Sequence, residues 1–224
     1  MKILIKFPTR GRGEKFLSVL DVYQNLCEDK ENTFFLITSD LDDPEMNNDE
    51  LKEILKGYTN LTILFSNGVS KIEAINRDIE KVEFDWDIVL LASDDMIPQI
   101  FGYDNVIRDK MKTYYPDNDG VLWFNDGFKK SELNTLCILG KKYYDRFGYI
   151  YYPEYKSCFC DNEFMEVANM LNKQTYIDDV IIKHEHPDWG YGRPDYVHQR
   201  NVADFNYDSN LFNTRRNNNF YLNI

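Results

Sequence analysis

Apolar residues in the first 95 positions follow two alternating spacings. Short continuous apolar runs predict buried strands, and apolar positions three or four apart predict amphipathic helices. The predicted strands are residues 2–7, 33–38, 61–65 and 86–92, and the predicted helices are residues 14–26, 49–55 and 70–82. Ser70 is the expected N-cap of the last helix. Four strand-and-helix units in succession predict an α/β fold, with a mostly parallel central sheet and helices on both faces.

The second half has shorter and less regular elements. Its predicted strands are residues 120–125, 135–139 and 175–182, of which the first two are joined by a polar turn. Its predicted helices are residues 141–147, ending at Gly148, and residues 160–171. Residues 195–224 are rich in Asn, Asp and Arg and show little periodicity. No Pro-, Gly- or Ser-rich linker separates the halves, so we expect one domain over residues 1–224.

The formal net charge of −12 gives the chain no general attraction to DNA, RNA or anionic membranes. Its own carboxylates can still bind a phosphate through a divalent cation. Cys158 and Cys160 lack the second cysteine pair that a zinc site needs, which favours free thiols in a reducing compartment. The N-terminus is too short and too charged for a signal peptide, and no apolar run is long enough to span a membrane, so we expect a cytoplasmic protein.

In parallel sheets, ligands bind outside the carboxyl ends of the strands, so the residues that follow each strand are the candidates for a binding site. Asp94 and Asp95 directly follow the fourth predicted strand. Two adjacent carboxylates at a strand end are costly unless water, a cation or hydrogen-bond donors meet them. They suit Mn²⁺ or Mg²⁺ bridging to a diphosphate. The alternative is an acidic turn that only caps a helix.

Two later motifs also allow both a functional and a purely structural interpretation. In a strand, His184 and His186 would face the same side, and imidazole beside carboxylates favours Mn²⁺; the alternative is an ordinary surface or core pair. Asp161 and Glu163 lie at the start of a predicted helix, where a carboxylate can be a simple cap. The functional interpretation is a general base that takes a proton from a hydroxyl group.

The loop at residues 8–13, PTRGRG, leads from the first strand into the first helix. Helix-start N–H groups and two arginines suit a phosphate or the edge of a nucleobase. The loop is neither a G-x-G-x-x-G motif nor a P-loop, so it does not indicate NAD or ATP.

These motifs occur along the chain in the order FPTRGR, TSDLDD, SNGVSKIEAINRDI, LLASDDM, GYIYYPEYKSCFCDNEF and KHEHP. In this order they resemble the inverting glycosyltransferases of the A fold, and are similar to the family 2 group with its bacterial and viral relatives. The likeness covers roughly residues 2–187. It implies the Rossmann-like glycosyltransferase-A fold, with a nucleotide-binding half at residues 1–95, an acceptor and catalytic half at residues 96–190, and a tail at residues 191–224.

The resemblance also implies roles for single residues. Around the nucleotide it places Pro8, Thr9, Arg10, Arg12, Asp40, Lys71, Asn76 and Asp94. Asp95 matches the metal-binding acid of the D-x-D element, present here as S-D-D, and His184 or His186 matches a late metal ligand. Asp161 matches the catalytic base, although Cys160 stands where glutamate is usual, so Asp161 and Glu163 both remain candidates.

The implied activity is Mn²⁺- or Mg²⁺-dependent transfer of a sugar from a nucleotide-sugar, by likeness a UDP-sugar, to an acceptor hydroxyl with inversion. The acceptor would be a glycan or another hydroxyl-bearing molecule, including a modified nucleic-acid base, and a viral enzyme would act in the host cytoplasm. Tyr149–Tyr155, Trp123 and Trp189 are the candidate acceptor surface. The tail arginines, among them Arg215, are expected to be solvated charges. The alternatives are a nucleotidyltransferase acting on sugar phosphates and a non-catalytic nucleotide-sugar- or glycan-binding module.

Overall fold

The computed structural model describes residues 1–68, 70–185 and 203–222. Within them a seven-stranded sheet has the order β3-β2-β1-β4-β7-β6-β8. The strands are β1 (Ile3–Pro8), β2 (Thr33–Asp40), β3 (Leu61–Ser66), β4 (Ile88–Leu91), β6 (Val121–Phe124), β7 (Ile138–Gly140) and β8 (Gln174–Ile177). Strands β1 to β4 are mutually parallel, and β7 runs antiparallel between β4 and β6. The predicted mostly parallel sheet is therefore confirmed.

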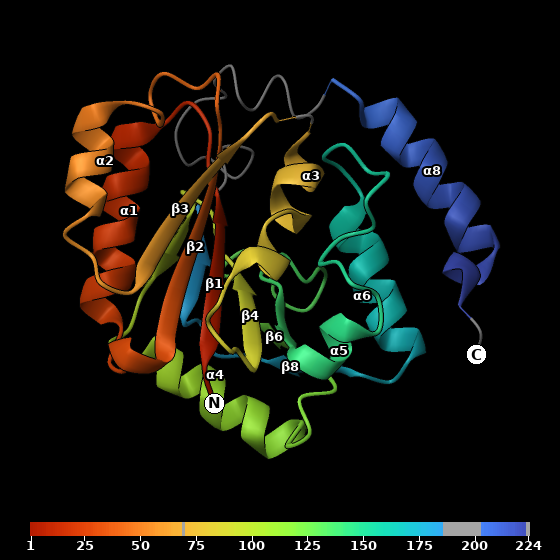
Figure 1. Ribbon diagram of the computed structural model, residues 1–224. Coiled ribbons are helices and arrows are strands. Elements are labelled where there is room, and N and C mark those ends of the chain that lie inside the picture. Colours follow the sequence, from red (N-terminus) through yellow and green to blue (C-terminus); the bar gives the residue numbers. More distant parts are fainter. Residues whose placement is uncertain (69, 186–202, 223–224) are drawn as a thin grey trace.

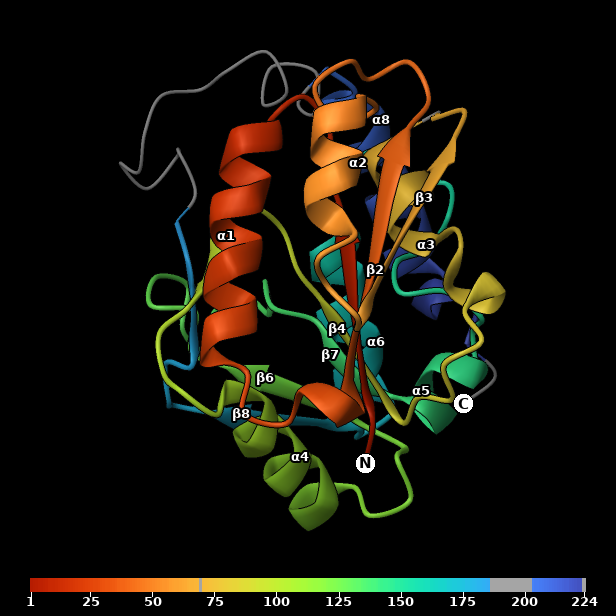
Figure 2. The same ribbon diagram turned by 60° about the vertical axis from the view of Figure 1, so that its left-hand side comes forward.

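Helices cover both faces of this sheet, as Figures 1 and 2 show. On one face lie α1 (Gly13–Leu26), α2 (Asp49–Leu55) and α4 (Tyr103–Tyr114), and on the other lie α3 (Lys71–Asn76), α5 (Lys141–Asp145) and α6 (Cys160–Met170). Strand β1 shows why: Ile3, Ile5 and Phe7 pack toward α1, whereas Leu4 belongs to the core on the α3 side. This alternation gives the sheet two apolar faces and hence two helical layers.

A second, two-stranded sheet pairs β5 (Met96–Pro98) with β9 (Ile182–His184) in antiparallel register. The single strand predicted over residues 175–182 is wrong, because it divides into β8 and β9, which belong to different sheets. The chain leaves the large sheet at Asp178, whose carboxylate accepts hydrogen bonds from Asn125 and Tyr176. Because the strand breaks here, the following residues can form β9 beside β5, close to the end of β4.

The helix predicted over residues 70–82 is also divided. Ser70 caps α3 as predicted, since its Oγ accepts the N–H of Glu73 at 3.1 Å. The helix ends at Asn76, however, and Asp78 has a φ of 73° before a short 3₁₀ helix, η2 (Ile79–Lys81). The Asp78 carboxylate is fully buried and accepts a hydrogen bond from Thr38 of β2. This tertiary contact, which the local apolar spacing does not reveal, accompanies the break in the helix.

Three regular elements were not predicted: α4, β5 and α8 (Phe205–Asn217). Helix α8 packs on the outer side of α6 (Figure 1). Two short 3₁₀ helices complete the described chain, η1 (Lys30–Asn32) and η4 (Asn219–Tyr221). The four cysteines are free thiols. Among the described helices, none has both the length and the apolar character needed to cross a membrane.

Candidate active site at the carboxyl ends of the strands

Asp40, the last residue of β2, lies where the loops after three strands meet. Its Oδ2 accepts a hydrogen bond from Nη1 of Arg10 at 2.5 Å, and its Oδ1 accepts one from Nη2 of Arg77 at 2.9 Å. Arg10 comes from the loop after β1 and also binds Asp42. Asp40 is therefore an acceptor flanked by two guanidinium donors.

Gly68, in the loop after β3, approaches Asp40 from another side. A Cβ atom at position 68 would collide with the Asp40 carboxylate. Glycine is thus the residue that lets the loop after β3 pass directly over this acid. In the sequence, Gly68 is part of the SNGVSKIEAINRDI motif, in which the resemblance gave roles only to Lys71 and Asn76.

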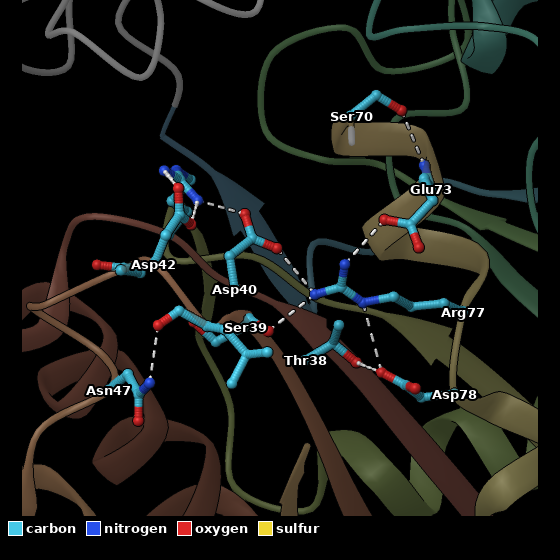
Figure 3. Close-up of polar contacts among 12 residues, drawn as sticks. Thr38, Ser39, Asp40, Asp42, Asn47, Ser70, Glu73, Arg77 and Asp78 are labelled. Atoms are coloured by element: carbon cyan, nitrogen blue, oxygen red, sulfur yellow. Dashed lines mark hydrogen bonds and ion pairs between the residues drawn. The ribbon is translucent and has the colours of Figure 1, made fainter. Parts of the chain in front are cut away.

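Arg77 was not identified from the sequence, although it organises this corner. Figure 3 shows its guanidinium between Asp40, Glu73 and Asp78. Besides Asp40, it donates to Oε2 of Glu73 at 2.8 Å and to the carbonyl oxygen of Ser39 at 2.8 Å. It belongs to the turn that ends α3, so the break of that helix delivers it to the strand ends.

Lys6 lies beneath Arg77 and is fully buried in β1. Its Nζ donates to the Thr38 hydroxyl and to the carbonyl oxygen of Arg77, the latter at 2.8 Å. Burial lowers the pKa of Lys6 to about 7, although Asp78 opposes the shift. A lysine inside an apolar run is the sequence feature that could have pointed to this network.

The loop after β1 is joined to Asp94. Pro8 ends β1, and the Thr9 backbone N–H donates to the carbonyl oxygen of Thr38 at 3.0 Å. Nη1 of Arg12 lies 2.9 Å and Nζ of Lys15 lies 3.4 Å from Oδ1 of Asp94. Burial raises the pKa of Asp94, with Arg12 and Lys15 opposing it. Asp94 thus holds the loop after β1 and the start of α1 against the end of β4.

Asp95 faces a different partner. Its Oδ2 lies 3.6 Å from Nε2 of His184, and its Oδ1 accepts a hydrogen bond from the Ser93 hydroxyl. Burial opposes ionisation of Asp95, but His184, Ser93 and Lys71 outweigh it and hold the pKa of Asp95 below its usual range. The pairing of β5 with β9 places Met96 opposite His184 and so brings His184 beside Asp95.

Asp161 lies in the first turn of α6 and is partly exposed. Burial raises its pKa, and the positive charge of Lys71, together with that of His184 when protonated, acts in the opposite direction. Lys71 and His184 act on Asp95 as well. Lys71 from α3 and His184 from β9 therefore act electrostatically on two acids expected from the sequence, Asp95 at the end of β4 and Asp161 in α6.

Two expected site residues make other contacts. Both carboxylate oxygens of Glu163 are bound by Arg215, with Nε at 2.8 Å from Oε2 and Nη2 at 2.9 Å from Oε1, and Tyr155 donates a further hydrogen bond. Arg215 is thus buried in an ion pair, which corrects the expectation of a solvated tail charge. The side-chain amide of Asn76 bonds to the backbone of residues 150–151, so it holds that loop.

Some residues of the candidate acceptor surface are buried in the core, and others are partly exposed. Trp123, Tyr151 and Tyr155 are buried and belong to the packing of the fold. Tyr149 and Tyr152 are partly exposed and line a pocket beside α6 and Arg215. Trp189, like His186, lies outside the described residues. Only part of the aromatic stretch is therefore available for stacking on a ligand.

Asp95 and His184 are of the residue types that bind divalent metal ions. Within residues 1–68, 70–185 and 203–222, no three His, Cys, Asp or Glu side chains form a group that could hold a metal ion. A carboxylate held in its ionised form next to an imidazole suits Mn²⁺, and Mn²⁺ and Mg²⁺ commonly take their remaining ligands from water and phosphate. The pair therefore fits a cation that a nucleotide diphosphate helps to bind.

No protein-family model and no curated protein sequence matches the chain. Solved structures do. The mannosyltransferase PcManGT from Pyrobaculum calidifontis, in complex with GDP-Man and Mn²⁺, is 12% identical with a TM-score of 0.63, over 85% of this chain and 58% of that one. Residues 1–349 of S. aureus TarS in complex with UDP are 16% identical with a TM-score of 0.62, over 81% and 59%. The complex of TarS with UDP-GlcNAc gives 16% identity and a TM-score of 0.61, over 81% and 57%.

The chain thus spans less than two thirds of the length of each of these structures. At this level of identity the likeness concerns the fold. The seven-stranded sheet with its two helical layers is a glycosyltransferase fold of the A type, as the sequence resemblance implied.

Proposed function

We propose that this chain is a metal-dependent glycosyltransferase that transfers a sugar from a UDP-sugar to an acceptor hydroxyl with inversion at the anomeric carbon. The observation that carries the proposal is the contact between Asp95 and His184 at the end of β4, with Lys71 acting electrostatically on both Asp95 and Asp161. Such a displacement requires groups that neutralise the leaving diphosphate and a base that takes a proton. Asp95 with His184 and the positive charge of Lys71 suit the first task, and Asp161 with its raised pKa suits the second. The fold supports the same conclusion, because its solved examples include nucleotide-sugar complexes.

The corner around Asp40 supports uracil as the base of the donor. The edge of uracil presents an acceptor, a donor and an acceptor in sequence. Nη1 of Arg10 already donates to Asp40 and Asp42, and Nη2 of Arg77 already donates to Asp40 and the carbonyl oxygen of Ser39, so the Asp40 carboxylate is the group that would accept the N3–H of uracil.

The diphosphate would lie between the loop at residues 8–13 and Asp95. Asp95 and His184 would hold Mn²⁺ or Mg²⁺, and the bound ion would supply Lewis-acid neutralisation of the charge that builds on the leaving diphosphate. Lys71 is exposed and contributes a second positive charge. Asp94 fixes Arg12 and Lys15 through its Oδ1 and so keeps the loop in place.

Asp161 would take the acceptor proton. The acceptor oxygen forms its bond to the anomeric carbon as the bond from that carbon to the diphosphate oxygen breaks, and the proton passes to the Asp161 carboxylate. Attack from the face opposite the diphosphate inverts the anomeric configuration. A raised pKa makes the carboxylate a better proton acceptor. Glu163 is less suited, because Arg215 and Tyr155 already occupy its oxygens.

The two halves of the chain would divide the work. Residues 1–95 supply the uridine and phosphate contacts, and residues 96–190 supply the base and the acceptor surface. Tyr149 and Tyr152 are the partly exposed aromatic side chains of that surface among the described residues, and such rings stack on sugars and on bases.

A donor-turnover assay tests this proposal. The protein is incubated with a panel of UDP-, GDP- and CMP-sugars with and without Mn²⁺, and release of the nucleotide is measured. We expect Mn²⁺-dependent release of UDP from at least one UDP-sugar, and its loss in Asp95→Ala. Formation of pyrophosphate from a sugar phosphate and a nucleoside triphosphate would instead identify a nucleotidyltransferase. Binding of a donor with no turnover, even with a range of glycan acceptors, would identify a binding module.

A further inference from the structure

The inner face of α8 is charged where a packed helix is normally apolar. Its three buried residues are Asp208, Phe212 and Arg215, at helical spacing. Buried acids and arginines are rare unless each has a specific partner. All three have partners within residues 152–163, the segment that leads into α6 and contains Asp161.

Asp208 fixes the loop in front of α6. It is fully buried, and its carboxylate accepts hydrogen bonds from the backbone N–H groups of Lys156, Ser157 and Cys158 at 2.8, 2.9 and 2.8 Å. Hydrogen bonds to an ionised acceptor are shorter and stronger than those between neutral groups. Because three such hydrogen bonds come from consecutive backbone N–H groups, they fix the backbone conformation of residues 156–158.

Phe212 supports a strained residue at the helix start. Phe159, the N-cap residue of α6, has a φ of 61°, a left-handed conformation that is costly for a bulky side chain. Its ring stacks on that of Phe212 with centroids 5.7 Å apart, and also contacts Phe205 at 5.1 Å. Phe159 sets the direction in which the chain enters α6, two residues before Asp161.

Arg215 fixes the other side of Asp161. It binds Glu163 through two parallel hydrogen bonds, and its guanidinium lies 3.3 Å from the ring centroid of Tyr152. The paired geometry restricts both the position and the rotation of the first turn of α6.

We propose that α8 is a positioning element for the base: Asp208, Phe212 and Arg215 hold the chain on both sides of Asp161 so that its carboxylate stays directed at the acceptor. The inference rests on the proposed function, in which Asp161 is the base. None of the three positioning residues is required to touch substrate. Displacement of a catalytic group by about 1 Å can lower the rate by about 10²-fold.

The test is a set of double-mutant cycles with Asp161→Asn, using UDP release from the active UDP-sugar. Asp208→Asn, Phe212→Leu and Arg215→Lys are each made alone and together with Asp161→Asn. Thr214→Ala, on the exposed side of the same helix, is the matched control. Thermal melting gives the folded fraction of every variant, and calorimetry gives its UDP affinity in Mn²⁺.

We expect each folded single variant to lower kcat by about tenfold to 10²-fold with UDP affinity and donor KM unchanged. On the Asp161→Asn background the same changes should cost less than about twofold, since residues that act through one group are not additive. Wild-type kcat in the folded variants, or an equal loss on both backgrounds, would overturn the inference. If one variant does not fold, the other two decide the result. Full turnover by Asp161→Asn alone would overturn the base assignment and this inference with it, whereas the uridine and metal proposals would stand.

Discussion

Nε2 of His184 lies 3.6 Å from Oδ2 of Asp95, although the two residues come from opposite halves of the chain. The contact depends on the small sheet in which β9 pairs with β5, the strand that directly follows the Asp94-Asp95 turn. A tertiary pairing of strands thus unites the two sequence motifs that first suggested a cation site.

Replacement of Asp40 should change which nucleotide binds. In Asp40→Asn the side chain no longer offers two ionised acceptor oxygens to Arg10 and Arg77, and one acceptor that could meet the N3–H of uracil is replaced by an amide donor. We expect UDP affinity to fall about tenfold or more, as for loss of a hydrogen bond to a charged group. Titration of UDP, GDP and CDP into both proteins measures the change. Asp42→Asn is the control, because Asp42 is exposed and also binds Arg10. Equal losses in the two variants would argue against a specific role for Asp40.

Gly68→Ala should also lower UDP affinity, in this case by a steric effect. The added Cβ would collide with the Asp40 carboxylate, so either the loop or the acid must move. UDP affinity should fall, and thermal stability should fall as well, because Asp40 is buried between Arg10 and Arg77. Asn67→Ala, at the neighbouring exposed position, should leave UDP affinity at the wild-type level. A Gly68→Ala protein that binds UDP normally would show that this corner does not receive the nucleotide.

The two candidate bases should differ in what their loss affects. Asp161→Asn should bind UDP normally and lose about 10²-fold or more of turnover. Glu163→Gln should instead unfold more easily, by about 3 kcal/mol, because it leaves Arg215 buried beside a neutral partner. Donor kinetics and urea unfolding of both variants measure these effects. Normal stability with lost turnover in Glu163→Gln, together with an active Asp161→Asn, would reverse the assignment.

Lys6 should make stability depend on pH in a defined direction. Its folded pKa of about 7 is below that of a lysine in the unfolded chain, so unfolding takes up a proton between about pH 7 and pH 10. The free energy of unfolding should therefore rise with pH in this window relative to Lys6→Met, at up to about 1.4 kcal/mol per pH unit. Urea unfolding of both proteins across this range isolates the contribution of Lys6. Parallel curves would mean that Lys6 keeps its ordinary pKa in the folded protein.

The sequence was sufficient to predict the elements whose apolar residues recur at a regular spacing. Helix α2 has the predicted bounds, α1 begins one residue earlier than predicted, and β1 is shifted by one residue at each end. It was insufficient where a charged residue is buried by a distant partner. Asp208 and Arg215 occupy two of the three buried positions of α8, so this helix has no continuous apolar face for a periodicity to reveal.

The same physical reason explains the parts of the candidate site that were missed. Arg77 reaches Asp40 because α3 ends early, and α3 ends early where Asp78 meets Thr38 of β2. Such a contact joins residues far apart in the chain, and neither residue type is unusual where it occurs. Asp94 and Asp95 could be found because two adjacent carboxylates after an apolar strand are informative without knowledge of their partners.

Calorimetric titration of UDP with and without Mn²⁺, on the wild type and on Asp95→Ala, tests the central claim most directly because it needs no acceptor. The account predicts that Mn²⁺ tightens UDP binding to the wild type by about tenfold or more, and that Asp95→Ala abolishes this gain while its Mn²⁺-free affinity stays at the wild-type level. UDP affinity that is the same with and without Mn²⁺ in the wild type, or a Mn²⁺ effect that survives in Asp95→Ala, would contradict it.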